Sequence, residues 1–74
     1  MDGKRTGILF YDKTIGAYNI QFRKDSFYDG LYRGEYFYIK VKNVWIPVRM
    51  EKNNSIWYLA GMPEIKLDGL IVCI

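Results

Sequence analysis

Apolar and polar residues alternate with a period of two along most of this chain, the pattern of strands that bury one face. The alternation is clear where Tyr18, Ile20 and Phe22 are separated by Asn19 and Gln21. Turn-forming residues recur about every 8 to 12 positions, and no stretch has convincing helical periodicity. The sequence therefore predicts strands over residues 8–11, 17–22, 35–42, 45–51, 55–61 and 70–74.

These strands predict an all-β fold, a five- or six-stranded antiparallel, strongly bent sheet or SH3-like barrel. Residues 1–74 have room for a single small β domain, and residues 1–6 are expected to form a loose N-terminal arm. The connection over 23–34 breaks the alternation, with apolar side chains expected to tuck inward: Phe27, Tyr28, Leu31 and Tyr32. One short helical turn in 24–33 stays open, and a two-layer sheet carrying that helix is the second choice.

The turn between strands 35–42 and 45–51 determines their pairing, because a slip of one residue would move each apolar set to the wrong face. A two-residue turn at Lys42-Asn43 is preferred over the next pair, which contains a valine, because valine resists positive φ. This register places Tyr36 opposite Arg49 and Lys40 opposite Trp45.

The next hairpin is expected to turn at Asn53-Asn54, since asparagine tolerates positive φ. That register pairs Met50 with Trp57 and Val48 with Leu59 inside, and places Tyr58 opposite Arg49 outside. Pro47 cannot donate a hydrogen bond to a ladder, so we expect a bulge or bend at its position.

The core of so short a chain has to rely on its largest side chains, for which the natural contributors are Phe10, Phe22, Phe37 and Trp57. The predicted inward sets of the two central strands are Phe37, Ile39 and Val41 on one and Ile46, Val48 and Met50 on the other.

The composition limits the chemistry this chain can perform. It has no histidine, which removes the commonest general base and the usual metal ligand. The carboxylate pairs Asp25 with Asp29 and Glu64 with Asp68 lie in turn-like segments and are expected to be solvated rather than catalytic. We expect no enzyme activity, no metal and no cofactor.

The single cysteine, Cys73, excludes an internal disulfide and is expected to be a packed, unreactive thiol. One cysteine suits a reducing compartment, and no apolar run is long enough for a membrane span or a signal peptide, so we expect a cytoplasmic location. The net charge of +3 is a mild basic bias, compatible with an acidic protein or a nucleic acid as partner.

Four segments carry a family resemblance: Gly7-Ile8-Leu9 with Asp12, Tyr18-Asn19-Ile20, residues 45–51 (WIPVRME), and residues 57–61 (WYLAG) with 69–72 (GLIV). In their spacing the chain resembles domain of unknown function family 5348, small proteins of Gram-positive bacteria. Members of that family are often found on phages, plasmids and conjugative elements. The resemblance implies a mobile-element context and no particular chemistry.

The predicted registers gather aromatic and basic side chains on the outer face of the central strands. This candidate binding surface consists of Tyr36, Tyr38, Lys40, Lys42, Trp45, Arg49 and Tyr58. Tyrosine, tryptophan and arginine dominate the energetics of protein interfaces, and rings interleaved with cations also bind single-stranded nucleic acids. The same residues favour strands without any partner, and the connection over 23–34 or a second subunit could cover them.

We therefore expect a non-enzymatic, protein-binding module, an accessory or interaction factor of a mobile genetic element. The alternative is a small barrel that binds single-stranded nucleic acid through the same surface. A protein partner is preferred over nucleic acid, and no membrane interaction is expected.

Overall fold

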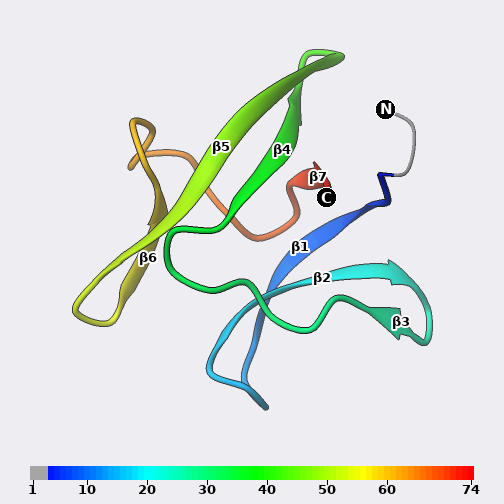
Figure 1. Ribbon diagram of the computed structural model, residues 1–74, viewed down its shortest axis with the longest axis horizontal. Coiled ribbons are helices and arrows are strands. Elements are labelled where there is room, and N and C mark those ends of the chain that lie inside the picture. Colours follow the sequence, from blue (N-terminus) through cyan, green and yellow to red (C-terminus); the bar gives the residue numbers. More distant parts are fainter. Residues whose placement is uncertain (1–3) are drawn as a thin grey trace.

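Seven β-strands form one antiparallel sheet in the computed structural model, which describes residues 4–74 (Figure 1). The strands are β1 (Thr6–Asp12), β2 (Ala17–Arg23), β3 (Ser26–Phe27), β4 (Tyr36–Val41), β5 (Val44–Asn53), β6 (Ile56–Leu59) and β7 (Ile71–Cys73). Their order across the sheet is β3-β2-β1-β7-β4-β5-β6. The prediction of a small, bent all-β sheet is confirmed. The extra strand is the two-residue β3, which lies where a helical turn was an alternative.

The C-terminal strand lies between β1 and β4. β7 pairs with β1 through Thr6 and Cys73, and with β4 through Tyr38 and Cys73. Arg5 and Ile74 extend the β1–β7 ladder by exchanging two backbone hydrogen bonds of 2.8 and 2.9 Å. Arg5 and Thr6, which the sequence placed in a loose arm, are therefore part of the sheet, while residues 1–3 of that arm lie outside the described chain.

The inner faces of the strands meet in one apolar core. Its buried members are Leu9, Ile20, Leu31, Phe37, Ile39, Val48, Met50, Leu59, Leu67 and Val72. Val41 and Ile46 are half-buried and pack against this core, so the predicted inward sets of β4 and β5 are confirmed. Phe10 was wrongly placed in the core: the alternation that buries Leu9 turns Phe10 outward, where its ring contacts that of Phe27 at 5.9 Å. Phe27 and Tyr32 were also expected to tuck inward, but they are 48% and 66% exposed.

The connection between β3 and β4 forms hydrogen bonds with both β2 and β5, which are not neighbours in the sheet. On one side Tyr28 and Leu31 donate backbone hydrogen bonds to β2, each 2.8 Å long. On the other side Gly34 donates to the Met50 carbonyl, and the Met50 amide donates to the Glu35 carbonyl at 2.9 Å. Residues 28–35 therefore bridge β2 to β5, and they complete the barrel-like enclosure of the core that the open sheet leaves unfinished (Figure 1).

Two buried polar side chains hold this bridge in place. The Asn19 side-chain oxygen accepts hydrogen bonds from the amides of Gly30 and Ile20, at 3.0 and 2.9 Å. The Glu35 carboxylate accepts one from the Tyr32 amide at 3.1 Å and a short one from the Tyr28 hydroxyl. Asn19 and Glu35 are only 5% and 7% exposed, so their polar groups depend on these partners rather than on water.

The first hairpin register is as predicted and the second is shifted by two residues. Lys42 and Asn43 form the turn between β4 and β5 with φ values of 49° and 66°. In the next hairpin Asn53 pairs with Ile56, so the turn is Asn54-Ser55, and Asn54 takes the positive φ of 58°. The expected turn at Asn53-Asn54 is wrong, and so are the pairs derived from it.

Pro47 causes no bulge in the β4–β5 ladder, contrary to expectation, because it pairs with Tyr38 in an unbroken register. In a two-residue hairpin closed by Val41 and Val44, every second pair lacks ladder hydrogen bonds, and the Tyr38–Pro47 pair is one of these. The proline nitrogen therefore faces the other edge of β5. There β6 pairs only with residues 50–53, so no ladder donor is lost.

Replacing Glu35 tests the bridge. Because the Glu35→Ala variant leaves the Tyr28 hydroxyl and the Tyr32 amide without their acceptor, it should lower the free energy of unfolding by about 2–3 kcal/mol. Urea denaturation measures this, and Glu35→Gln should lose less because it keeps an acceptor. The exposed Glu64→Ala is the control, and a Glu35→Ala loss no larger than that of the control contradicts the assignment.

A second prediction concerns alkaline pH. The hydrogen bond to Glu35, together with burial, raises the pKa of Tyr28 from 10.0 to about 12. The folded state holds the Tyr28 proton more tightly than the unfolded state does. The stability that this hydrogen bond contributes is therefore complete below the pKa of Tyr28 in the unfolded chain, and it is lost as pH rises through the pKa in the folded protein. The stability difference between wild type and Tyr28→Phe in urea titrations should therefore shrink above about pH 10. With Tyr32→Phe as control, a difference that stays constant up to the folded pKa contradicts this.

Candidate functional site

Six of the seven residues of the candidate binding surface lie on the outer face of β4 and β5 or in the turn that joins the two strands. Alternation along β4 points Tyr36, Tyr38 and Lys40 to the same side. In the ladder, Arg49 lies opposite Tyr36 and Trp45 lies opposite Lys40, as predicted. Lys42 lies in the turn at the end of this ladder. Tyr36 is 68% exposed, so the connection that was expected as a possible cover leaves this ring open to solvent.

Arg49 is the charged centre of this surface. Its guanidinium lies 6.0 Å from the centroid of the Tyr36 ring, and its Nε is 2.7 Å from the Glu51 carboxylate. Hydrogen bonding with Tyr36, together with the Glu51 charge, raises the pKa of Arg49. Arg33 approaches the same carboxylate at 3.5 Å. One carboxylate therefore lies between two guanidinium groups, so the local charge stays positive.

The other two rings on the face also have a cation beside them. The ammonium group of Lys40 lies 5.6 Å from the Trp45 ring, and that of Lys4 lies 5.9 Å from the Tyr38 ring. Sequence reasoning did not include Lys4 or Arg33, because both reach the face from segments outside the two strands. Only the folded arrangement, with β7 between β1 and β4, brings Lys4 beside β4.

Tyr58 does not join the Tyr36–Arg49 row. The shifted register of the β5–β6 hairpin places Tyr58 opposite Glu51 rather than Arg49. Tyr58 instead lines a separate depression of about 250 Å³, together with Asn53, Ile56 and Pro63. The predicted row of two tyrosines around one arginine is therefore wrong in its third member.

Two shallow depressions lie on either side of Tyr36 and share Pro47. The first, of about 230 Å³, is lined by Lys4, Tyr36, Phe37, Tyr38, Pro47 and Ile74. The second, of about 460 Å³, is lined by Tyr36, Pro47, Val48, Arg49, Ala60 and Gly61. Each has a cation at its border and apolar groups in its wall. Together they form a groove, which we call the Tyr36 groove.

Residues 7–74 match the family described as domain of unknown function (DUF5348). The chain belongs to this family. A crystal structure of a protein from Ruminococcus gnavus, determined by the Northeast Structural Genomics Consortium, is 51% identical and aligns with a TM-score of 0.86 over 95% of this chain and 100% of that one. Comparison with curated proteins gives no match. The family resemblance noted in the sequence is thus confirmed.

Asp68, outside the candidate binding surface of this DUF5348 chain, has structural partners. Asp68 accepts hydrogen bonds from the Tyr11 amide at 3.0 Å and from the Tyr18 hydroxyl at 3.5 Å. Burial of the Tyr18 side chain, together with the Asp68 charge, raises the pKa of Tyr18. Cys73 is buried in β7. Over residues 4–74, no three cysteine or carboxylate side chains gather as metal ligands would.

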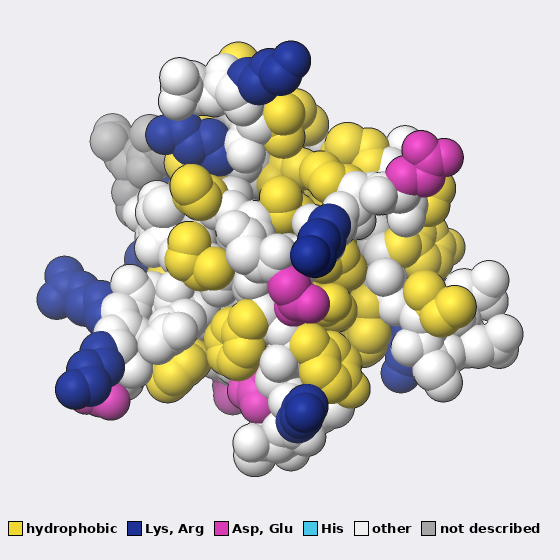
Figure 2. All heavy atoms as spheres, turned by 180° about the vertical axis from the view of Figure 1, so that it is seen from behind, with side chains coloured by type: hydrophobic (Ala, Val, Ile, Leu, Met, Phe, Trp, Pro, Cys, Tyr) yellow, Lys and Arg dark blue, Asp and Glu magenta, His cyan; other side chains and the backbone are white. Residues whose placement is uncertain are grey.

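The face of the molecule seen from behind mixes charge types (Figure 2). From behind, Figure 2 shows hydrophobic side chains exposed between separate basic and acidic ones, without one large region of a single charge. Within the described residues there is no helix that could cross a membrane.

The geometry of Arg49 can be tested by double-mutant cycles. Because the ring of Tyr36 lies beside the guanidinium, the Tyr36→Ala and Arg49→Ala changes should couple by about 0.5–1 kcal/mol in unfolding free energy. Tyr58→Ala and Arg49→Ala should couple more weakly, because Tyr58 lies opposite Glu51 rather than opposite Arg49. Urea denaturation of the six proteins measures both cycles. Stronger coupling of Arg49 to Tyr58 than to Tyr36 contradicts the observed register.

Proposed function

We propose that this DUF5348 chain is a non-enzymatic binding module that binds a protein segment in the Tyr36 groove. The observation that carries the proposal is the exposed Tyr36 ring, which stands between two depressions with Arg49 beside it. Tyrosine, tryptophan and arginine supply most of the energy in protein interfaces, and depressions beside them accept side chains of the partner.

The groove fits a protein segment because its walls are apolar between the charges. Pro47 borders both depressions, while Ile74 and Ala60 line one each. Partner side chains can contact ring edges, the proline and the aliphatic stems of the cations beside the rings.

A second candidate function is binding of single-stranded nucleic acid. It is favoured by the same three cation–ring pairs, which alternate rings with positive charge along one face. Rings that stack bases contribute about 1–3 kcal/mol each, and the neighbouring cations neutralise phosphates. This candidate predicts an affinity that falls steeply with salt.

The biological setting is part of the proposal. The absence of histidine from the sequence supports a binding role without catalysis, and the single cysteine supports action in the reducing cytoplasm. The family resemblance supports an accessory role on a mobile genetic element of a Gram-positive host.

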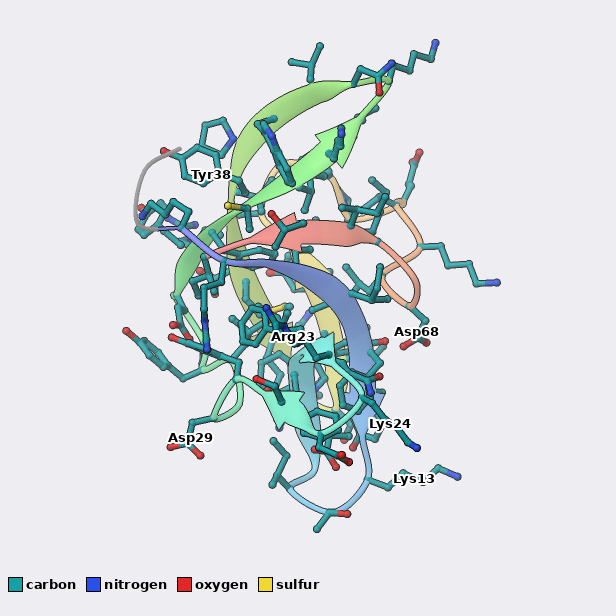
Figure 3. The ribbon with its side chains drawn as sticks, turned by 90° about the vertical axis from the view of Figure 1, so that its right-hand side faces the viewer. Lys13, Arg23, Lys24, Asp29, Tyr38 and Asp68 are labelled. Carbon is teal, nitrogen blue, oxygen red and sulfur yellow. The ribbon has the colours of Figure 1, made fainter. Side chains whose placement is uncertain are left out.

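Affinity capture from a host lysate, with and without nuclease, tests the groove. A variant carrying Tyr36→Ala and Arg49→Ala should lose about 90% or more of the partner captured by the wild type, since such residues act as hot spots. The control carries Lys13→Ala and Ile15→Ala, which also remove a cation and an exposed apolar side chain, at a turn far from Tyr38 (Figure 3). All three proteins should show the same far-UV spectrum.

The outcomes separate the two candidates. Nuclease-resistant capture that the double variant loses supports a protein partner. Capture that nuclease removes, with oligonucleotide binding that weakens between about 50 and 200 mM salt, identifies a nucleic-acid binder instead. Equal capture by the double variant and the control contradicts the groove altogether.

A further inference from the structure

The outer side of the sheet beyond the Tyr36 groove carries three exposed apolar side chains and one glutamine in a single cross-strand row. Ile71 pairs with Ile8, Ile8 with Gln21, and Gln21 with Phe27, so these side chains lie side by side across β7, β1, β2 and β3. Ile8, Ile71 and Phe27 are 45%, 42% and 48% exposed. We call this set, with Phe10 against Phe27, the isoleucine row. Contiguous exposed apolar groups on a small protein mark a contact surface.

Positive charges stand at both ends of the isoleucine row. The β4–β7 register, continued by one pair, brings Lys40 beside Ile71. At the other end Arg23 pairs with Ser26 next to Phe27, and Lys24 follows in the turn. Figure 3 shows Arg23 and Lys24 at this β2–β3 turn, below β1 and β7, while Tyr38 lies above them on β4.

The nearby carboxylates do not balance these charges at both ends. Asp12, on the outer side of β1, accepts hydrogen bonds from the Thr14 amide at 3.0 Å and from the Asn19 side chain at 3.3 Å. Asp25 is exposed in the same turn as Lys24 and offsets one charge at that end only. The row therefore has three exposed apolar side chains, with Gln21 between Ile8 and Phe27, and basic side chains at both ends.

We propose that the isoleucine row is a second docking site, which binds an acidic amphipathic helix of a partner protein. Three strand spacings of about 4.8 Å make the row about 14 Å long, the length of about ten helical residues. Apolar side chains on one face of such a helix contact Ile71, Ile8 and Phe27. Carboxylates toward its ends face Lys40 and Arg23.

The charges select this occupant over the others. Nucleic-acid bases stack on aromatic rings, whereas two of the three exposed apolar side chains of the row are aliphatic. A second copy of the chain, docked row against row, brings cations against cations in either direction, because both ends of the row are basic. An acidic helix satisfies both the apolar middle and the basic ends. The proposal does not depend on the Tyr36 groove.

Two synthetic peptides of about 14 residues test the site. One has leucine along a single helical face with glutamate and alanine elsewhere, and the other has lysine in place of every glutamate. Fluorescence anisotropy with the full chain should show binding of the glutamate peptide only. The variant carrying Ile8→Gln and Ile71→Gln should bind about tenfold more weakly or worse. Ile56→Gln, at an isoleucine 70% exposed on β6 outside the row, should bind as the wild type does.

A charge reversal provides a check that does not alter the row itself. The variant carrying Arg23→Glu and Lys24→Glu should lose affinity for the glutamate peptide and gain it for the lysine peptide. It leaves Tyr36 and Arg49 intact, so its capture of partners through the Tyr36 groove should be unchanged.

Several results would overturn the proposal. They are absence of glutamate-peptide binding, equal binding of both peptides, and an unchanged affinity in the Ile8→Gln and Ile71→Gln variant. The proposal would also be overturned if sedimentation showed that the wild type is a dimer and that the variant carrying Ile8→Gln and Ile71→Gln is a monomer. A second copy of the chain would then cover the row.

Discussion

The bridge over residues 28–35 is the constraint on which this small structure depends. The sheet ends at β3 on one side and at β6 on the other, and no ladder joins these edges among the described strands. The bridge instead connects β2 to Met50 of β5 and brings Leu31 into the core. Beside these backbone hydrogen bonds, the bridge is held by Asn19 and Glu35, whose buried polar atoms would destabilise the fold if they were unpaired.

This arrangement explains which surfaces are left for binding. Because the bridge and the β6–β7 segment enclose the inner face, the outer face of the strands remains exposed. It divides into the Tyr36 groove on β4 and β5 and the isoleucine row on β7, β1 and β3. The free edge of β5 beside the groove carries Pro47, which removes a backbone donor there and discourages pairing with a foreign strand. Contacts with partners are therefore expected through side chains.

Much of the fold could be predicted from the sequence, because alternation determines which residues face inward. The β4–β5 register was predictable because only one turn placement avoided a positive φ at Val44. The β5–β6 register was not, since Asn53-Asn54 and Asn54-Ser55 both supply an asparagine and keep the same faces. A shift of two residues leaves the apolar pattern unchanged, yet it moves Tyr58 from Arg49 to Glu51. Asn19 and Glu35 gave no local signal either, because their partners come from the bridge.

Native-state hydrogen exchange of the backbone amides tests the bridge most directly. If residues 28–35 belong to the same cooperative unit as the sheet, the amides of Leu31 and Gly34 should open with the free energy of the Leu9 amide in β1. Exchange of the Leu31 and Gly34 amides as fast as that of the exposed Lys13 turn would contradict the account, because the core would then be enclosed without them.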